Sequence, residues 1–153
     1  FITGEYSFTI EANYNNDVPD YVMADTICHE LSHLRGFMRE DEAGFIAYLA
    51  CIHSDNVNLK YSGILNALSY VLNSVYSNCG AAVYTELYKS MDIQLMRDYL
   101  YDSRYWDKYR TPVADVADAV NNAYLVANAQ THGVKSYGRM VDLLLAYYIS
   151  QHN

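Results

Sequence analysis

Proline and glycine are scarce in this sequence, with two prolines and seven glycines among 153 residues. Both residue types interrupt helices, so their scarcity leaves room for long helical stretches. Basic residues are also few: ten Lys and Arg stand against 18 Asp and Glu, giving a net charge of −8. Such a charge argues against a nucleic-acid binder, which would carry a basic surface.

Cysteines and long apolar runs are also scarce. Cys28, Cys51 and Cys79 are too few and too scattered for a disulfide framework or a thiolate zinc site. We expect all three to be buried as small apolar residues. The longest candidate run, 141–149, carries Asp142 and is about half of the roughly 20 residues that span a bilayer. Because the chain begins at Phe1, we expect it to be one piece of a longer protein.

The length of the chain, residues 1–153, fits a single domain, and 52% of its residues are hydrophobic. Long stretches show helical periodicity, and the 17 tyrosines are suited to helix packing. Residues 1–18 instead alternate loosely and predict a short strand or hairpin. Helices are predicted over about 20–35, 39–53, 59–78, 81–109, 112–129 and 137–150. Gly36 ends the first helix and Gly80 separates the third from the fourth, which we expect to break near Asp102 and Ser103. The sequence thus predicts a mainly α domain with a small β element at its start.

The segment His29-Glu30-Leu31-Ser32-His33 matches the HExxH pattern. On a helix, two histidines four residues apart project from one face and can share a zinc ion (Zn²⁺). Glu30 would take a proton from the zinc-bound water, whose pKa the metal lowers to about 7, and pass it to the leaving amine. The apolar residues around the motif, Leu31 among them, predict a buried helix. We therefore predict a zinc metallopeptidase that hydrolyses peptide bonds in a peptide or protein substrate, with Glu30 as general base.

A third protein ligand is expected from the acidic cluster Glu40-Asp41-Glu42. Glu40 shares a helix face with small residues, which let the second helix approach the histidines closely, whereas Glu42 lies on a bulkier face. The small residues are Ala43, Gly44, Ala47 and Cys51. We favour Glu40 as the third zinc ligand, with Glu42 as the open alternative and Asp41 as a third choice.

The Glu40-x-x-Ala43 spacing after the HExxH motif is similar to the Glu-x-x-Ala-Asp or Glu-x-x-Ala-Asn element of gluzincin metallopeptidases. This resemblance implies a zincin-like fold with Glu40 as a zinc ligand. Four segments, TIEANYN (9–15), CHELSHLRGF (28–37), REDEAGF (39–45) and SYGRMVDLLLAY (136–147), more closely resemble a bacterial family, domain of unknown function 3810. Members of that family look like membrane-bound zincins. The resemblance implies a membrane anchor outside this chain and brings no known substrate.

Two features depart from the gluzincin pattern. Gluzincins carry Asp or Asn four residues after the ligand glutamate, where this chain has Gly44. That side chain normally orients a zinc-bound histidine through its other ring nitrogen, so we expect Asp25 or Asp142 to do so here. The gap between His33 and Glu40 is also shorter than in gluzincins, which requires a tight turn.

A peptidase also needs a donor to the oxyanion, commonly Tyr, His or Arg. Tyr137 and Arg139 are the candidates because they lie in a resembling segment; the alternative is that Tyr137 packs and Arg139 pairs with an acid. His53 is expected to have a structural role. The strand before the zinc helix could pair with an extended substrate along the backbone of residues 11–13.

Two rival hypotheses remain. The chain could be a zinc-binding sensor or signalling module of a membrane protein with little or no hydrolytic activity, or a helical packing domain in which the motif is accidental. An intact Glu30 favours the peptidase, because a purely structural zinc site needs no base and fills all four positions with protein ligands. The sequence predicts neither the side of the membrane nor the oligomeric state.

Overall fold

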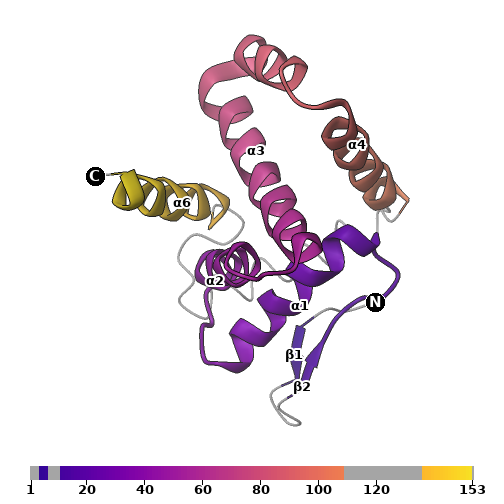
Figure 1. The fold of residues 1–153 in the computed structure, drawn as a ribbon, viewed down its shortest axis with the longest axis vertical. Coiled ribbons are helices and arrows are strands. Elements are labelled where there is room, and N and C mark those ends of the chain that lie inside the picture. The colour runs from indigo at the N-terminus through magenta and orange to yellow at the C-terminus, as the bar shows by residue number, and fades with distance from the viewer. Residues whose placement is uncertain (1–3, 7–10, 109–135, 153) are drawn as a thin grey trace.

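The computed structural model of the chain describes residues 4–6, 11–108 and 136–152, and these form a mainly helical domain (Figure 1). A two-stranded antiparallel sheet stands at its start: β1 (Gly4–Tyr6) pairs with β2 (Glu11–Asn13), with Glu5 opposite Ala12. Both strands lie against the first helix. The predicted mainly α class and the predicted N-terminal hairpin are therefore confirmed.

Helices α1 (Asp20–Leu34) and α2 (Glu40–Ile52) are joined by a tight turn. Pro19 stands directly before α1, where its fixed φ suits a helix start. Gly36 follows α1 with a φ of 96°, in a region that side chains disfavour and glycine tolerates. Its N–H donates to the carbonyl of His33 at 2.9 Å and closes the last turn. The predicted bounds of both helices are confirmed to within a residue.

Small side chains on α2 allow three helices to approach one another closely. Ala43, Ala47 and Cys51 are fully buried, and Gly44 is buried between them, as the sequence predicted. The helix packs against α1 and α3 (Figure 1). A Cβ added to Gly63 on α3 would stand 2.5 Å from the Cβ of Cys51, so this helix crossing depends on glycine.

The element α3 (Val57–Lys89) consists of two helical segments that meet at a kink at Gly80. The φ of 83° and ψ of 171° at Gly80 are not helical. The predicted separation of two helices at Gly80 is therefore confirmed.

Helix α4 (Ile93–Asp107) begins at a boundary that was not predicted from the sequence. The carboxylate of Asp92 accepts a hydrogen bond from the Gln94 N–H at 2.8 Å and caps the new helix. The predicted break near Asp102 and Ser103 is wrong, since α4 is continuous there. An N-cap carboxylate fixes a helix start, whereas polar residues inside a helix do not end it.

The last described helix, α6 (Ser136–His152), packs against α2 and α3. Its Met140 is almost fully buried and joins a small core with Leu65 and Leu72 of α3. The helix predicted over 137–150 is confirmed, and the one predicted over 112–129 lies outside the described residues.

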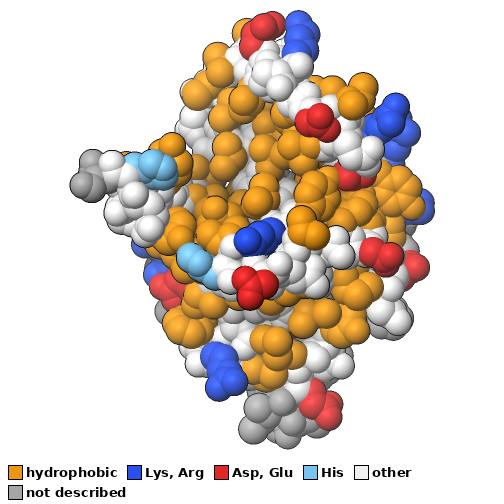
Figure 2. Space-filling model, in the orientation of Figure 1, with side chains coloured by type: hydrophobic (Ala, Val, Ile, Leu, Met, Phe, Trp, Pro, Cys, Tyr) orange, Lys and Arg blue, Asp and Glu red, His pale blue; other side chains and the backbone are white. Residues whose placement is uncertain are grey.

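Helices α3 and α4 form an arm that carries many exposed hydrophobic side chains (Figures 1 and 2). At its base the hydroxyls of Tyr21 and Tyr61 both donate to Asp98, to its carbonyl and its carboxylate respectively. Farther out, the ring centroids of Tyr88 and Tyr99 lie 6.3 Å apart across the two helices. Part of the large tyrosine content therefore serves helix packing, as expected.

The cysteines divide between the core and this arm. Cys51 is buried and Cys28 half-buried, with their Sγ atoms 4.0 Å apart, but Cys79 on the arm is exposed. The expectation that all three are buried is wrong for Cys79, because the outer turns of α3 have few neighbours to cover them. No helix within the described residues has both the length and the hydrophobicity needed to cross a membrane.

Candidate metal centre

The face of α1 that packs against its neighbours is polar. Its buried residues are Asp25, Glu30, Ser32 and His33. Leu31, which we expected to be buried, is 48% exposed. Each buried polar group without a partner lowers the free energy of unfolding by about 1–3 kcal/mol. We therefore expect the buried polar groups of α1 to have hydrogen-bond partners or a function.

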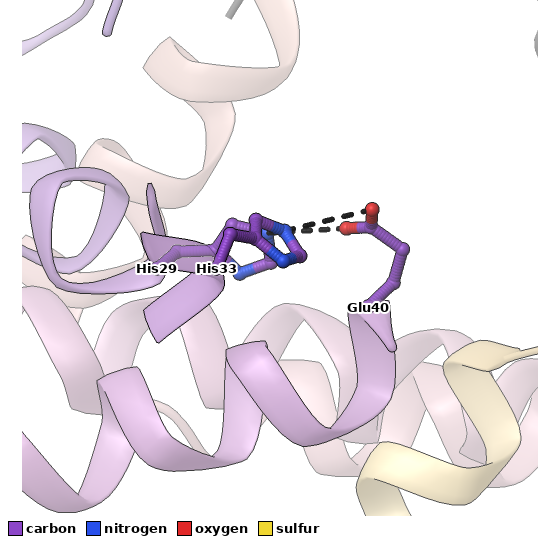
Figure 3. A group of neighbouring side chains, drawn as sticks. All are labelled: His29, His33 and Glu40. Carbon is purple, nitrogen blue, oxygen red and sulfur yellow. Dashed lines mark hydrogen bonds and ion pairs between the residues drawn. The ribbon is translucent and has the colours of Figure 1, made fainter. Parts of the chain in front are cut away.

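His29 and His33 on α1 and Glu40 on α2 bring their ligand atoms together (Figure 3). The two Nε2 atoms are 3.1 Å apart, His29 Nε2 lies 3.1 Å from Glu40 Oε2, and His33 Nε2 lies 3.6 Å from Glu40 Oε1. Ligands of a tetrahedral zinc ion at 2.0–2.1 Å would be about 3.3–3.4 Å apart. The separations of these three pairs bracket that value.

One carboxylate of the acidic cluster contacts the histidines, and the other two contact Arg39. Glu40 faces the histidines, whereas the buried Asp41 accepts hydrogen bonds from Arg39 at 2.6 and 3.2 Å. Glu42 Oε1 lies 3.5 Å from the same guanidinium. Arg39 therefore compensates the two neighbouring acids, and Glu40 is the carboxylate that the structure brings to the histidines.

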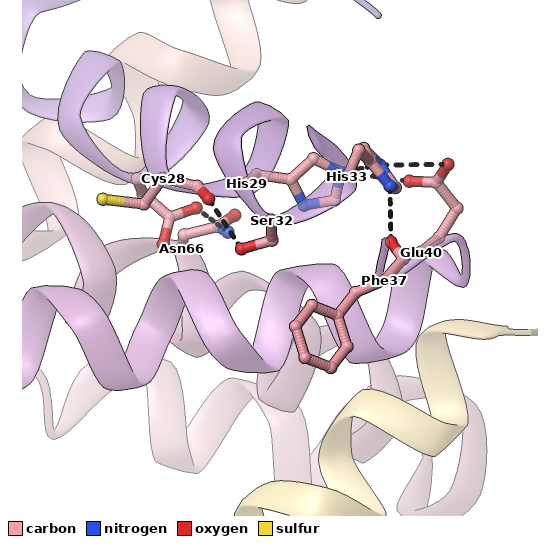
Figure 4. A network of polar contacts seen from close by, with 8 residues as sticks. Cys28, His29, Ser32, His33, Phe37, Glu40 and Asn66 are labelled. Atoms are coloured by element: carbon pink, nitrogen blue, oxygen red, sulfur yellow. Dashed lines mark hydrogen bonds and ion pairs between the residues drawn. The ribbon is translucent and has the colours of Figure 1, made fainter. Parts of the chain in front are cut away.

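The turn between α1 and α2 fixes the orientation of His33 (Figure 4). His33 Nδ1 lies 2.8 Å from the backbone carbonyl of Phe37. Because a carbonyl can only accept, Nδ1 carries the proton, and the lone pair of the neutral ring is on Nε2, which faces Glu40. Only the short gap between the second histidine and Glu40 pointed to a tight turn here, and nothing in the residue types indicated this contact.

The charges of the cluster favour a bound cation. Hydrogen bonds from His29 and then His33 hold the pKa of Glu40 at about 2, so it is ionised at neutral pH. The hydrogen bond to Glu40 in turn raises the pKa of His33, against the opposing effect of burial. A ring nitrogen must be free of its proton before it can bind a metal. Zinc binding would therefore displace any proton that His33 shares with Glu40.

Glu30 lies beside the cluster in a buried position. Its Oε2 has no hydrogen-bond partner among the described residues. Burial raises the pKa of Glu30; the charges of His29 and His33 oppose this shift and that of Glu40 adds to it. A buried carboxylate with an unpartnered oxygen and a raised pKa suits a general base. Two imidazoles, one carboxylate and this base make a donor set that fits zinc.

The remaining candidates lie elsewhere or outside the description. Arg139 Nε is 3.9 Å from Asp41 Oδ2, which agrees with the alternative that Arg139 pairs with an acid. Tyr137 belongs to α6, but its side chain lies outside the described residues. His53 accepts from or donates to the Tyr147 hydroxyl at 3.0 Å, consistent with a structural role.

Neither Asp25 nor Asp142 orients a histidine. The Asp25 carboxylate accepts a hydrogen bond from the Asn66 side chain on α3, and the Asp25 N–H donates to Ser62 Oγ at 3.0 Å. Asp142 is exposed on α6. The expectation that one of them replaces the gluzincin Asp or Asn is wrong, because polar residues of α3 engage Asp25 and α6 turns Asp142 to solvent.

Comparison with known proteins gives one match. A family model described as a protein of unknown function (DUF3810) matches residues 1–145. No curated protein and no solved structure matches the chain. Since the matched region covers both strands, α1 to α4 and most of α6, the chain belongs to the DUF3810 family of proteins of unknown function.

Proposed function

We propose that this chain is a zinc-dependent metallopeptidase of the zincin type, with a gluzincin-like ligand set of His29, His33 and Glu40. The observation that carries the proposal is the convergence of two Nε2 atoms and a carboxylate at 3.1–3.6 Å, a spacing that suits one tetrahedral ion. Two imidazoles and a carboxylate leave the fourth position to water or substrate, as in hydrolytic zinc sites.

The chain's own residues would supply the proton transfers. A zinc ion, when bound, would polarise the peptide carbonyl and make a water molecule acidic. Glu30 would take one proton from the attacking water on its unpartnered Oε2 and deliver it to the leaving nitrogen. The water oxygen forms a bond to the carbonyl carbon as the carbon–nitrogen bond breaks, leaving a carboxyl group and an amine. The raised pKa of Glu30 makes it a stronger base for the first transfer.

Of the two candidate donors to the oxyanion, we prefer Tyr137 to Arg139. Arg139 lies near the buried Asp41, which favours an ion pair over contact with substrate. Tyr137 is the second residue of α6, which packs against the helix that carries Glu40. We retain Tyr137 as the first of the two candidates to test, by comparing peptide hydrolysis in Tyr137→Phe and Arg139→Gln.

Zinc content and peptide cleavage test the proposal together. The wild-type protein should hold about one zinc per chain. His33→Ala should lose the zinc, whereas His53→Ala, which replaces a histidine bonded to Tyr147, should retain it. Glu30→Gln should keep zinc and lose about 10²–10⁴-fold in peptide-library hydrolysis. A wild-type protein that takes up no zinc from a slight excess would overturn the proposal.

One outcome would select the alternative function. If zinc binds with the predicted dependence on His33, yet wild type and Glu30→Gln release the same peptides at the same rate, the site is a zinc sensor or signalling module without hydrolytic activity. By the family resemblance we also propose that the full-length protein is held in a membrane by segments outside this chain. Recovery of the full-length protein in the soluble fraction of lysed cells would contradict that placement.

A further inference from the structure

The absence of a side chain at Gly44 leaves a small space, called the hollow below, at the point where four helices meet. A Cβ added there would lie 3.8 Å from Tyr70 Oη of α3, 3.9 Å from His29 Nδ1 of α1 and 3.9 Å from Met140 Sδ of α6. Two of these three atoms are polar. The hollow is roughly as large as a methyl group, which is also about the size of one water molecule.

The two histidines differ in the hydrogen bonding of Nδ1, the ring nitrogen that does not face Glu40. His33 Nδ1 has the Phe37 carbonyl as its partner. His29 uses its Nε2 toward Glu40 and His33, and within residues 4–6, 11–108 and 136–152 no side chain or backbone atom is hydrogen-bonded to its Nδ1. A zinc-bound histidine almost always donates its other N–H to a carboxylate, a carbonyl or a water molecule. For His29 the space beside Gly44, 3.9 Å from its Nδ1 at the position of an added Cβ, offers a place for such an acceptor.

We propose that Tyr70 is a positioning residue for His29 and acts through one water molecule beside Gly44; the inference rests on the proposed zinc site. The water accepts the hydrogen bond from His29 Nδ1–H and donates one to Tyr70 Oη. A phenolic oxygen has two lone pairs and one proton, so Tyr70 can accept this bond alongside another interaction. Met140 Sδ offers a further, weak acceptor. Glycine at position 44 makes room for the water, which does what an Asp or Asn side chain would do directly.

Three variants distinguish this arrangement from ordinary packing. Gly44→Ala places a methyl group in the hollow at ordinary contact distances of 3.8–3.9 Å, so the metal-free protein should melt no lower than wild type. The methyl displaces the water, and the zinc dissociation constant should rise about 10- to 100-fold. Tyr70→Phe should raise it by a similar factor. Gly44→Asn in the Tyr70→Phe background should restore zinc affinity, because the amide oxygen can accept from His29 Nδ1 directly.

The measurements are zinc affinity by competition with a chromophoric chelator and the melting temperature of the metal-free protein. Gly44→Ala combined with Tyr70→Phe should bind zinc no more weakly than either single variant, since both break the same bridge. Wild-type affinity in Gly44→Ala or in a folded Tyr70→Phe would overturn the inference while leaving the zinc site intact. A wild-type protein that binds no zinc would instead overturn the proposed function, and the inference with it.

Discussion

Asp25 offers a stability prediction that does not depend on a metal. The side chain is 3% exposed, and its Oδ1 has no hydrogen-bond partner among the described residues. Burial raises the pKa of Asp25 to about 8; the nearby Cys28 adds to this shift and the hydrogen bond from Asn66 opposes it. The folded protein therefore holds this carboxyl protonated at pH values where an unfolded chain ionises it.

The sign and the size of the effect follow from proton linkage. The pKa of Asp25 is 3.8 for the free residue and about 8 in the fold, so between these values the folded state binds the extra proton. The free energy of unfolding should then fall as pH rises, by at most about 1.4 kcal/mol per pH unit from this one group. Asp25→Asn removes the titration and keeps an oxygen that can accept from Asn66. Its stability should approach that of wild type near pH 5 and exceed it near pH 8.

Urea unfolding at several pH values, with chelator present, measures this directly. The comparison is wild type, Asp25→Asn and Asp142→Asn, the last replacing an exposed aspartate on α6. The difference between wild type and Asp25→Asn should widen steadily with pH, while Asp142→Asn should follow wild type. Parallel pH profiles for wild type and Asp25→Asn would refute the argument that burial keeps this carboxyl neutral.

Three further predictions concern packing and metal. Gly63→Ala should lower the free energy of unfolding by about 1–3 kcal/mol, because its Cβ would stand 2.5 Å from that of Cys51. Gly138→Ala, with no atom within 4 Å of the added Cβ, should leave the free energy of unfolding unchanged or raise it. If Gly63→Ala and Gly138→Ala changed urea unfolding by the same amount, the packing argument would be contradicted. Leu72→Ala, at a fully buried position, should cost about 2.7–5 kcal/mol in the same assay. Zinc at 100 times its dissociation constant should stabilise wild type by about 2.7 kcal/mol but not His33→Ala, and a thermal shift shared by both would exclude this site.

Local spacing made α1, α2 and the candidate ligands predictable. The four-residue interval from His29 to His33 and the small residues on the Glu40 face are properties of one helix each. Glycine at position 36 marked the turn because few other residues adopt its conformation. These features need no knowledge of distant contacts, and the structure places them where they were expected.

Features that depend on neighbours from elsewhere in the chain could not be predicted. The engagement of Asp25 by Asn66 spans 41 residues and follows from how α3 crosses α1. The contact of His33 with Phe37 uses a backbone carbonyl, which leaves no signature in residue types. Leu31 is exposed although its sequence pattern is apolar, because the polar face of α1 is the one that packs. A pattern reveals that a helix has two faces without revealing which one its neighbours cover.

The position of all three candidate ligands between residues 29 and 40 limits what a metal can do for the rest of the fold. A cross-link reduces the entropy of the unfolded chain by an amount that grows with the logarithm of the length of the loop it closes. Here that loop is short, since it comprises only the end of α1 and one turn. A bound ion would act as a local clip on the α1–α2 junction. It would not tie α3 and α4 to the body of the domain, because neither contributes a candidate ligand among the described residues. Removing the ion should therefore expose the turn at residues 35–39 to a protease while the α3–α4 arm keeps its protection.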